Sequence, residues 1–157
     1  MKIRGDMVCV YIARPTETSH EFLQLHRVPD DYLGGTWQTV YGGIEENETA
    51  FAAALREMKE ESGLVPREFF RVSIAPSFYT DVNDTLWIVP SFCAIVDRDA
   101  KVVMDHESDA SRWIARDEVD RAFMWPTDRM AIAEICRDIL DDGPAKAYLR
   151  IPLQRVS

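Results

Sequence analysis

Short apolar runs separated by polar turns occupy the first part of the chain and predict β-strands. Met7–Ile12 and Phe22–His26 are two such runs, and the polar segment Pro15–His20 between them predicts a hairpin. Val28–Thr36 contains a proline, two aspartates and two glycines, which favour turns, so we expect a loop there. The sequence then predicts a short strand at Trp37–Tyr41.

Further apolar runs predict strands later in the chain. These runs are Phe69–Ile74, Leu86–Val96, Val102–Met104 and Arg112–Ala115. Pro90 has no N–H to donate to a neighbouring strand, so we expect the centre of the second run to lie at a sheet edge or a bulge.

Two segments show helical spacing of their apolar residues. Phe51, Leu55 and Met58 share one side of a helix that we expect to begin near Thr49, a suitable N-cap, and to end at Ser62. A second helix is predicted after Trp125-Pro126 with Thr127 as its N-cap, and Asp142-Gly143-Pro144 ends it. Its apolar stripe consists of Ile132, Ile135, Cys136, Ile139 and Leu140. Strands interleaved with these helices predict an α/β (α+β) fold whose mixed sheet is covered on both faces.

The first helix carries a cluster of negative charge on the side opposite its apolar residues. Glu57, Glu60 and Glu61 stand at positions i, i+3 and i+4, so their carboxylates lie together. Each like-charged pair costs roughly 0.2–0.5 kcal/mol, and the helix dipole disfavours anions in this last turn. A solvated helix end with Gly63 as its C-cap is one explanation. A divalent cation bound by the carboxylate oxygens is the other, because it removes both penalties.

The residues around this cluster favour the cation. The segment 42–64 has seven positions of fixed identity and two of apolar character. They are Gly42, Glu48, Arg56, Glu57, Glu60, Glu61 and Gly63, with Met58 and Leu64 as the apolar pair. This segment resembles the signature box of the Nudix hydrolases.

The resemblance implies an α/β/α sandwich with a mixed β-sheet that holds Mg²⁺ or Mn²⁺ and cleaves a nucleoside diphosphate linked to another group. It implies that Glu57, Glu60 and Glu61 bind metal, together with the backbone carbonyl of Gly42. Glu57 and Glu60 are the expected catalytic residues, and Glu57 matches the general base of some relatives. Glu48, Arg56 and Gly63 are expected to be structural, with Arg56 paired to Glu48.

Glu107 is the candidate metal ligand from outside the box. It lies in the polar turn Asp105–Ser111, six residues before Trp113. This spacing resembles the bacterial dihydroneopterin triphosphate pyrophosphatases and their deoxynucleotide-cleaving relatives. A solvated turn glutamate is the alternative.

Arg27 and Tyr41 are the candidate substrate-binding residues. Arg27 ends a predicted strand, where a guanidinium can pair with phosphate, and Tyr41 directly precedes the box. The Pro29–Thr36 loop, with Tyr32, is expected to close over a ring system by stacking. Other aromatic residues are candidates either for stacking or for the core. They are Trp37, Phe78, Tyr79, Trp87 and Trp125.

Composition narrows the class of partner. The net charge of −9 argues against broad attraction to a nucleic-acid polymer or an anionic membrane, so a small phosphorylated metabolite or nucleotide is expected. The three cysteines are far apart and form no Cys-x-x-Cys pair, so we expect reduced core residues. No stretch has membrane-spanning length and Met7–Ile12 is shorter than a signal-peptide core. We expect a single soluble, cytoplasmic domain, 1–157, and leave a homodimer open.

The leading functional hypothesis is a metal-dependent pyrophosphohydrolase of a small triphosphate, either a nucleoside or deoxynucleoside triphosphate or dihydroneopterin triphosphate. Pyrophosphate and a monophosphate would be its products. Nucleotide sugars, dinucleoside polyphosphates and capped RNA remain open as substrates of the same reaction class. A nucleotide sensor that keeps this fold without turnover is the hypothesis from another class.

Overall fold

The central element of the protein is strand β2, Met7–Pro15, in which every residue from Val8 to Ala13 is buried. A computed structural model describes residues 1–155, so the last two residues of the expected domain 1–157 lie outside it. One edge of β2 pairs in parallel with β9, Ser91–Ile95. Its other edge pairs antiparallel with β5, Val40–Gly43, and then with β3, His20–Arg27. Because parallel and antiparallel pairs meet on one strand, the sheet is mixed, as predicted.

The main sheet has the strand order β10-β3-β2-β9-β6 along its path, with β4 paired to β3 and β5 paired to β2. The remaining strands of this sheet are β4 (Trp37–Gln38), β6 (Glu68–Val72) and β10 (Ser108–Ala115). The predicted hairpin and the strands near residues 69–74 and 112–115 are confirmed. The predicted strand Trp37–Tyr41 is divided at Thr39, whose hydroxyl donates to the carbonyl of Val10 at 2.7 Å.

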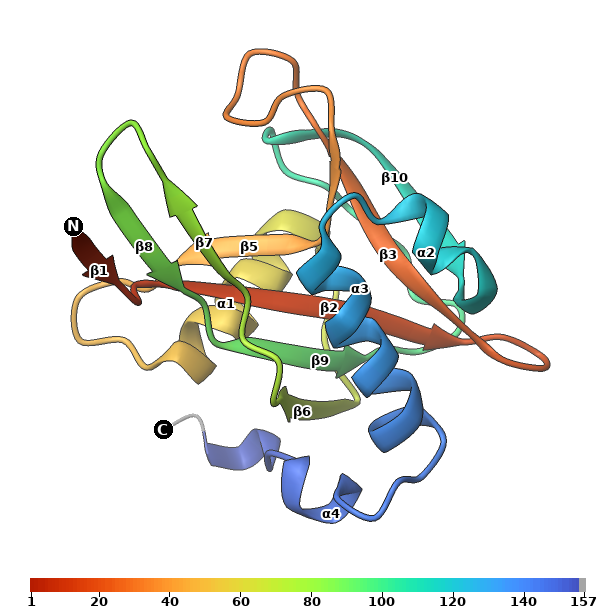
Figure 1. The fold of residues 1–157 in the computed structure, drawn as a ribbon. Helices are drawn as coiled ribbons and strands as arrows, with labels where there is room; N and C mark the ends of the chain where they lie inside the picture. Colours follow the sequence, from red (N-terminus) through yellow and green to blue (C-terminus); the bar gives the residue numbers. More distant parts are fainter. Residues whose placement is uncertain (156–157) are drawn as a thin grey trace.

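A helical layer covers each face of the main sheet, with α1 (Ala50–Ser62) behind it and α3 (Pro126–Glu134) in front in Figure 1. Alternate residues of β2 supply the two cores. Val8, Val10 and Ile12 face α1, whereas Cys9, Tyr11 and Ala13 face α3. This arrangement confirms the α/β/α sandwich.

Helix α1 has the boundaries that the sequence predicts. The Thr49 side chain caps it by accepting from the N–H of Ala52 at 3.2 Å. Gly63 ends it in the left-handed conformation, φ 68°, and donates its N–H to the carbonyl of Lys59. Met58 is fully buried, so the apolar side of the helix fixes its rotation against the sheet.

The predicted strand Leu86–Val96 is wrong as a single element. It is divided by Val89 and Pro90 into β8, Thr85–Ile88, and β9 of the main sheet. Strand β8 belongs to a separate small sheet, β1-β8-β7, with β1 at Lys2–Arg4 and β7 at Ser77–Thr80. The cause is the missing N–H of Pro90, which interrupts the ladder, so the chain changes sheet there.

Two further predictions are corrected. Val102–Met104 forms no strand; the N–H of Val103 donates instead to the carbonyl of Ser62 at 2.8 Å and covers the end of α1. Thr127 is not the N-cap of α3, because Pro126 occupies the first turn and Trp125 is the capping position. Proline at this position needs no hydrogen-bond partner, so the helix begins before Thr127.

The remaining helical elements are short. They are η1 (Arg116–Glu118), α2 (Val119–Ala122), the π-helical segment η2 (Ile135–Leu140) that continues α3, α4 (Lys146–Leu149) and η3 (Leu153–Arg155). Cys9, Cys93 and Cys136 are buried and unpaired, as expected. None of the helices within residues 1–155 is both long enough and apolar enough to cross a bilayer.

Replacing Gly63 with alanine should destabilise the protein by about 1–2 kcal/mol, because only glycine adopts φ 68° without strain. The added Cβ would also lie 2.9 Å from the Cβ of Val103. Urea unfolding followed by circular dichroism measures the change. Gly5→Ala is the control, because its Cβ would meet only ordinary contact at 3.6 Å. Equal stabilities of the two variants would contradict this role of Gly63.

Candidate functional site

The site begins where α1 packs against β5. Gly42 pairs with Val8 in the sheet, and the side chain of Glu57 lies directly over the Gly42 backbone. A Cβ on Gly42 would stand 2.0 Å from the Cδ of Glu57. This position therefore requires glycine so that the carboxylate can approach the strand.

Arg56 organises the loop and the carboxylates around it. Its Nε and Nη2 donate to the two oxygens of Glu48 at 3.0 and 2.8 Å, which confirms the predicted pairing. Nη2 also donates to the carbonyl of Gly43 at 2.8 Å. Nη1 donates to Glu57 at 2.8 Å and to Glu60 at 3.2 Å. The guanidinium therefore fixes the loop between β5 and α1, and its bond to Glu48 holds the pKa of that carboxyl below its ordinary value.

The three helix carboxylates differ strongly in exposure. The side chain of Glu60 is 55% exposed and that of Glu57 is 15% exposed. Glu61 is only 5% exposed, and no hydrogen bond to its carboxylate occurs within residues 1–155. Burial is the largest of the effects that raise the pKa of Glu61 to about 9, and the nearby charges of Glu57, Glu107 and Asp105 contribute to the same rise. The site thus contains a buried acid surrounded by other acids.

Glu107 reaches this cluster through the turn before β10. Its N–H donates to the carboxylate of Asp105 at 3.0 Å, and its carbonyl accepts from the N–H of Val28 at 3.0 Å. Its carboxylate lies 4.0 Å from Nη2 of Arg27, which also pairs with Asp31. The turn is therefore tied to the end of β3, and the structure brings Glu107 and Arg27 to the box.

The donor set fits a hard divalent cation. Carboxylate oxygens are preferred ligands of Mg²⁺, and positive charge stabilises the anionic form of a buried acid among like charges. Within the described residues, however, no three acidic, histidine or cysteine side chains converge closely enough to form a preformed metal site. Arg56 instead binds both Glu57 and Glu60, so these two carboxylates point toward its guanidinium. The metal-binding roles of these residues stay predictions.

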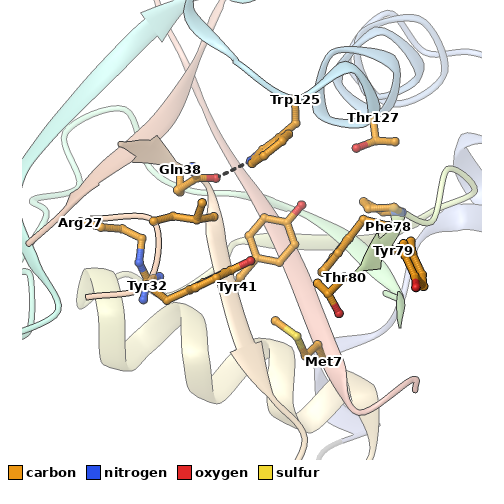
Figure 2. Close-up of a pocket in the computed structure, with 12 residues that line it drawn as sticks. Met7, Arg27, Tyr32, Gln38, Tyr41, Phe78, Tyr79, Thr80, Trp125 and Thr127 are labelled. Carbon is orange, nitrogen blue, oxygen red and sulfur yellow. Dashed lines mark hydrogen bonds between the residues drawn. The ribbon is translucent and has the colours of Figure 1, made fainter. Parts of the chain in front are cut away.

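A cavity of about 340 Å³ lies beside Arg27 and Tyr41 (Figure 2). Arg27 lines it and also faces Glu107, so this side chain joins the cavity to the acidic cluster. The walls come from the ends of β2, β3, β4 and β5, the 28–36 loop, β7 and the start of α3. They are formed by Met7, Arg27, Tyr32, Leu33, Gln38, Tyr41, Pro76, Phe78, Tyr79, Thr80, Trp125 and Thr127. Its volume is in the range of small-molecule sites.

The aromatic candidates separate into two groups. Tyr32, Phe78, Tyr79 and Trp125 line the cavity, as does Tyr41. Trp37 instead lies under the guanidinium of Arg112, 4.1 Å from its ring centre, and Trp87 stacks on Phe78. Trp37 therefore takes part in a structural contact and is not among the residues that line the cavity.

Asp128, at the start of α3, holds the cavity residue Tyr41, a role that sequence reasoning missed. Its carboxylate accepts from Tyr11 at 2.9 Å and from Tyr41 at 3.1 Å. Asp128 is 2% exposed, and burial raises its pKa. Gln38 was likewise missed as a cavity residue. The bonds of Gln38 to Trp125 and of Asp128 to Tyr41 join residues that are distant in the sequence, so no local pattern predicts these contacts.

Known proteins are similar to this chain in sequence and fold. A family model described as "NUDIX domain" matches residues 4–135. The "Putative 8-oxo-dGTP diphosphatase 3" of Mycobacterium tuberculosis is 34% identical over 107 residues, which make up 68% of this chain and 49% of that protein. This chain therefore spans about half the length of that relative.

Solved structures share the architecture. The Ap4A hydrolase of C. elegans superimposes with a TM-score of 0.70 at 17% identity, covering 85% of this chain and 96% of that one. The dihydroneopterin triphosphate pyrophosphohydrolase of E. coli gives 0.67 at 23% identity, also covering 85% and 96%. At these identities the likeness concerns the fold alone.

Glu61 should make stability depend on pH in the metal-free protein. Its pKa of about 9 in the folded protein exceeds the ordinary value of 4.5, so its stabilising contribution is complete below about pH 4.5 and is lost as the pH rises toward 9. In EDTA, the Tm of the wild type should therefore fall across this range more steeply than that of Glu61→Gln. Circular dichroism melts at several pH values measure both slopes.

The matched control is Glu60→Gln, which removes an exposed carboxylate of the same helix. This variant should keep the wild-type slope. Parallel slopes for wild type and Glu61→Gln would show that the carboxylate is not desolvated in the folded protein.

Proposed function

This chain belongs to the NUDIX family, and from that premise we propose that it is a divalent-metal-dependent pyrophosphohydrolase of a small nucleoside triphosphate-like substrate. The products would be pyrophosphate and a monophosphate. The observation that carries the proposal is the buried carboxylate of Glu61, which lies among Glu57, Glu107 and Asp105 beside a cavity lined by Arg27. Such a cluster suits a cation that must meet an anionic substrate.

Glu57, Glu60, Glu61 and Glu107 would hold Mg²⁺ or Mn²⁺, with the carbonyl of Gly42 as a further ligand. When bound, the cation neutralises charge on the phosphate oxygens and polarises the attacking water. Arg56 binds Glu48 and the carbonyl of Gly43 at the end of β5, so it would fix the backbone next to the Gly42 carbonyl.

Glu57 is the proposed general base. Burial raises its pKa, whereas the hydrogen bond from Arg56 favours its charged form. A raised pKa makes the ionised carboxylate a stronger base, which suits it to accept a proton from water. Its contact with Gly42 limits the directions in which it can point.

Arg27 and Tyr41 are the proposed substrate-binding residues. The guanidinium of Arg27 lies between the cavity and the acidic cluster, which suits a phosphate chain that runs from one to the other. Tyr41 lines the same cavity one residue before Gly42. A ring system would occupy the cavity while its phosphates face the carboxylates.

The relative from Mycobacterium tuberculosis supports deoxynucleoside triphosphates as the first substrates to assay. The E. coli fold neighbour adds dihydroneopterin triphosphate, and the C. elegans neighbour adds dinucleoside polyphosphates as members of the same reaction class. Nucleotide sugars and capped RNA complete the panel. A sensor without turnover would bind one of these compounds and release no product. The unpaired, buried cysteines support the proposed cytoplasmic location.

Purified protein with Mg²⁺ should release pyrophosphate from at least one triphosphate of the panel. Glu57→Gln should lower kcat by roughly 100-fold or more, because it removes the proposed base and a ligand together. Product analysis by ion-exchange chromatography measures the reaction. Glu46→Gln, an exposed carboxylate of the preceding loop, is the control and should retain full activity. Full activity of Glu57→Gln would refute the assignment.

Gly42→Ala should also abolish most of the activity. The new Cβ overlaps the Cδ of Glu57 at 2.0 Å, so the carboxylate must move by an ångström or more, and such a displacement costs about 100-fold in rate. Gly43→Ala is the matched control, since its Cβ would meet nothing within 4 Å. Steady-state kinetics on both variants, with circular dichroism to confirm folding, tests the contact. Similar losses in both variants would argue against it.

A further inference from the structure

The side chain of Gln38 joins two walls of the cavity that come from distant parts of the chain. Its Oε1 accepts from the indole Nε1 of Trp125 at 3.0 Å, a bond drawn in Figure 2. Its Nε2 donates to the hydroxyl of Thr36 at 2.8 Å and to the sulfur of Met124 at 3.4 Å. Gln38 is 5% exposed, so its amide is held by these contacts rather than by solvent.

The Thr36 bond extends the connection into the loop that carries Tyr32. The hydroxyl of Thr36 donates to the carbonyl of Leu33 at 2.6 Å, and the N–H of Thr36 donates to the same oxygen at 3.3 Å. Leu33 has φ 57°, a left-handed conformation that a leucine rarely adopts. These hydrogen bonds therefore hold the loop in a conformation that its sequence alone disfavours.

Three aromatic rings that line the cavity make no stacking contact with another aromatic ring in the part of the chain that the structure describes. Within residues 1–155, Tyr32, Tyr41 and Trp125 form no stacked or edge contact with another aromatic ring. Figure 2 shows Trp125 and Tyr32 on different sides of the cavity, with Tyr41 between them. The indole N–H of Trp125 is already used by Gln38, so this residue offers a ligand only its ring surface.

We infer that Gln38 is a positioning residue that sets the separation between Trp125 and the Tyr32 loop, and so adapts the cavity to a flat ring. Recognition at Trp125 would then rest on stacking, which tolerates different ring substituents, rather than on a hydrogen bond from the indole. The inference deepens the proposed function, on which it rests for the triphosphate part of the ligand. Binding of the ring itself can be measured without turnover.

Isothermal titration calorimetry with deoxyguanosine monophosphate and Mg²⁺ tests this role. Gln38→Met keeps the length of the side chain and removes its hydrogen bonds, so affinity should fall roughly tenfold. The affinity for inorganic pyrophosphate, which has no ring, should stay unchanged. In kinetics with a hydrolysed triphosphate, KM should rise while kcat stays within about twofold.

Gln24→Met is the matched control. Gln24 is also a buried glutamine, and its amide binds Arg112 at 2.9 Å and the carbonyl of Ala122 at 3.2 Å, neither of which lines the cavity. This variant should bind deoxyguanosine monophosphate as the wild type does. Thr36→Val removes the hydrogen bonds of the Thr36 hydroxyl with Gln38 and Leu33 but leaves the bond between Gln38 and Trp125, so it should weaken binding by a smaller factor. This variant replaces Gln38→Met in the test if Gln38→Met does not fold.

The inference is overturned if Gln38→Met, or Thr36→Val in its place, binds the monophosphate as tightly as wild type. It is equally overturned if Gln24→Met loses as much affinity, or if the wild type does not bind this ligand. Hydrolysis of a panel compound without ring binding would leave the proposed function intact. Ring binding without hydrolysis of any compound would remove the proposed function and leave the role of Gln38.

Discussion

Burial of the Glu61 carboxylate is the constraint on which the site depends. The packing of Met58 and its neighbours sets the rotation of α1, and this rotation places Glu61 inside the protein and Glu57 over Gly42. An acid held among acids is unfavourable in a medium of low dielectric constant. Core packing therefore stabilises an arrangement of carboxylates that electrostatics alone would disperse.

Arg56 and Arg27 provide positive charge at two different places in the site. Arg56 binds Glu48, the backbone of Gly43 and two helix carboxylates, so it maintains the shape of the box. Arg27 faces both Glu107 and the cavity. Because the two guanidinium groups lie on different elements, the geometry of the box does not depend on the residue proposed to bind phosphate.

Local features of the fold were predicted well and long-range ones poorly. The caps of α1 follow from Thr49 and Gly63, since both act within one turn of the helix. Apolar content alone, however, assigned Val102–Met104 to a strand, although this segment covers the end of α1. Apolar content also predicted one strand where the structure has β8 and β9. Pairing partners decide to which sheet a strand belongs, and hydrophobic periodicity does not reveal them.

The sequence by itself determined the acidic box, because its residues lie within one loop and one helix whose geometry is local. Only the tertiary structure decided the cavity. Gln38 and Trp125 are separated by 87 positions, as are Tyr41 and Asp128, and each pair meets through hydrogen bonds between the sheet and the start of α3. Such contacts depend on how the helix packs across the sheet. The acidic cluster is therefore local in origin, whereas the shape of the cavity follows from the assembly of the whole domain.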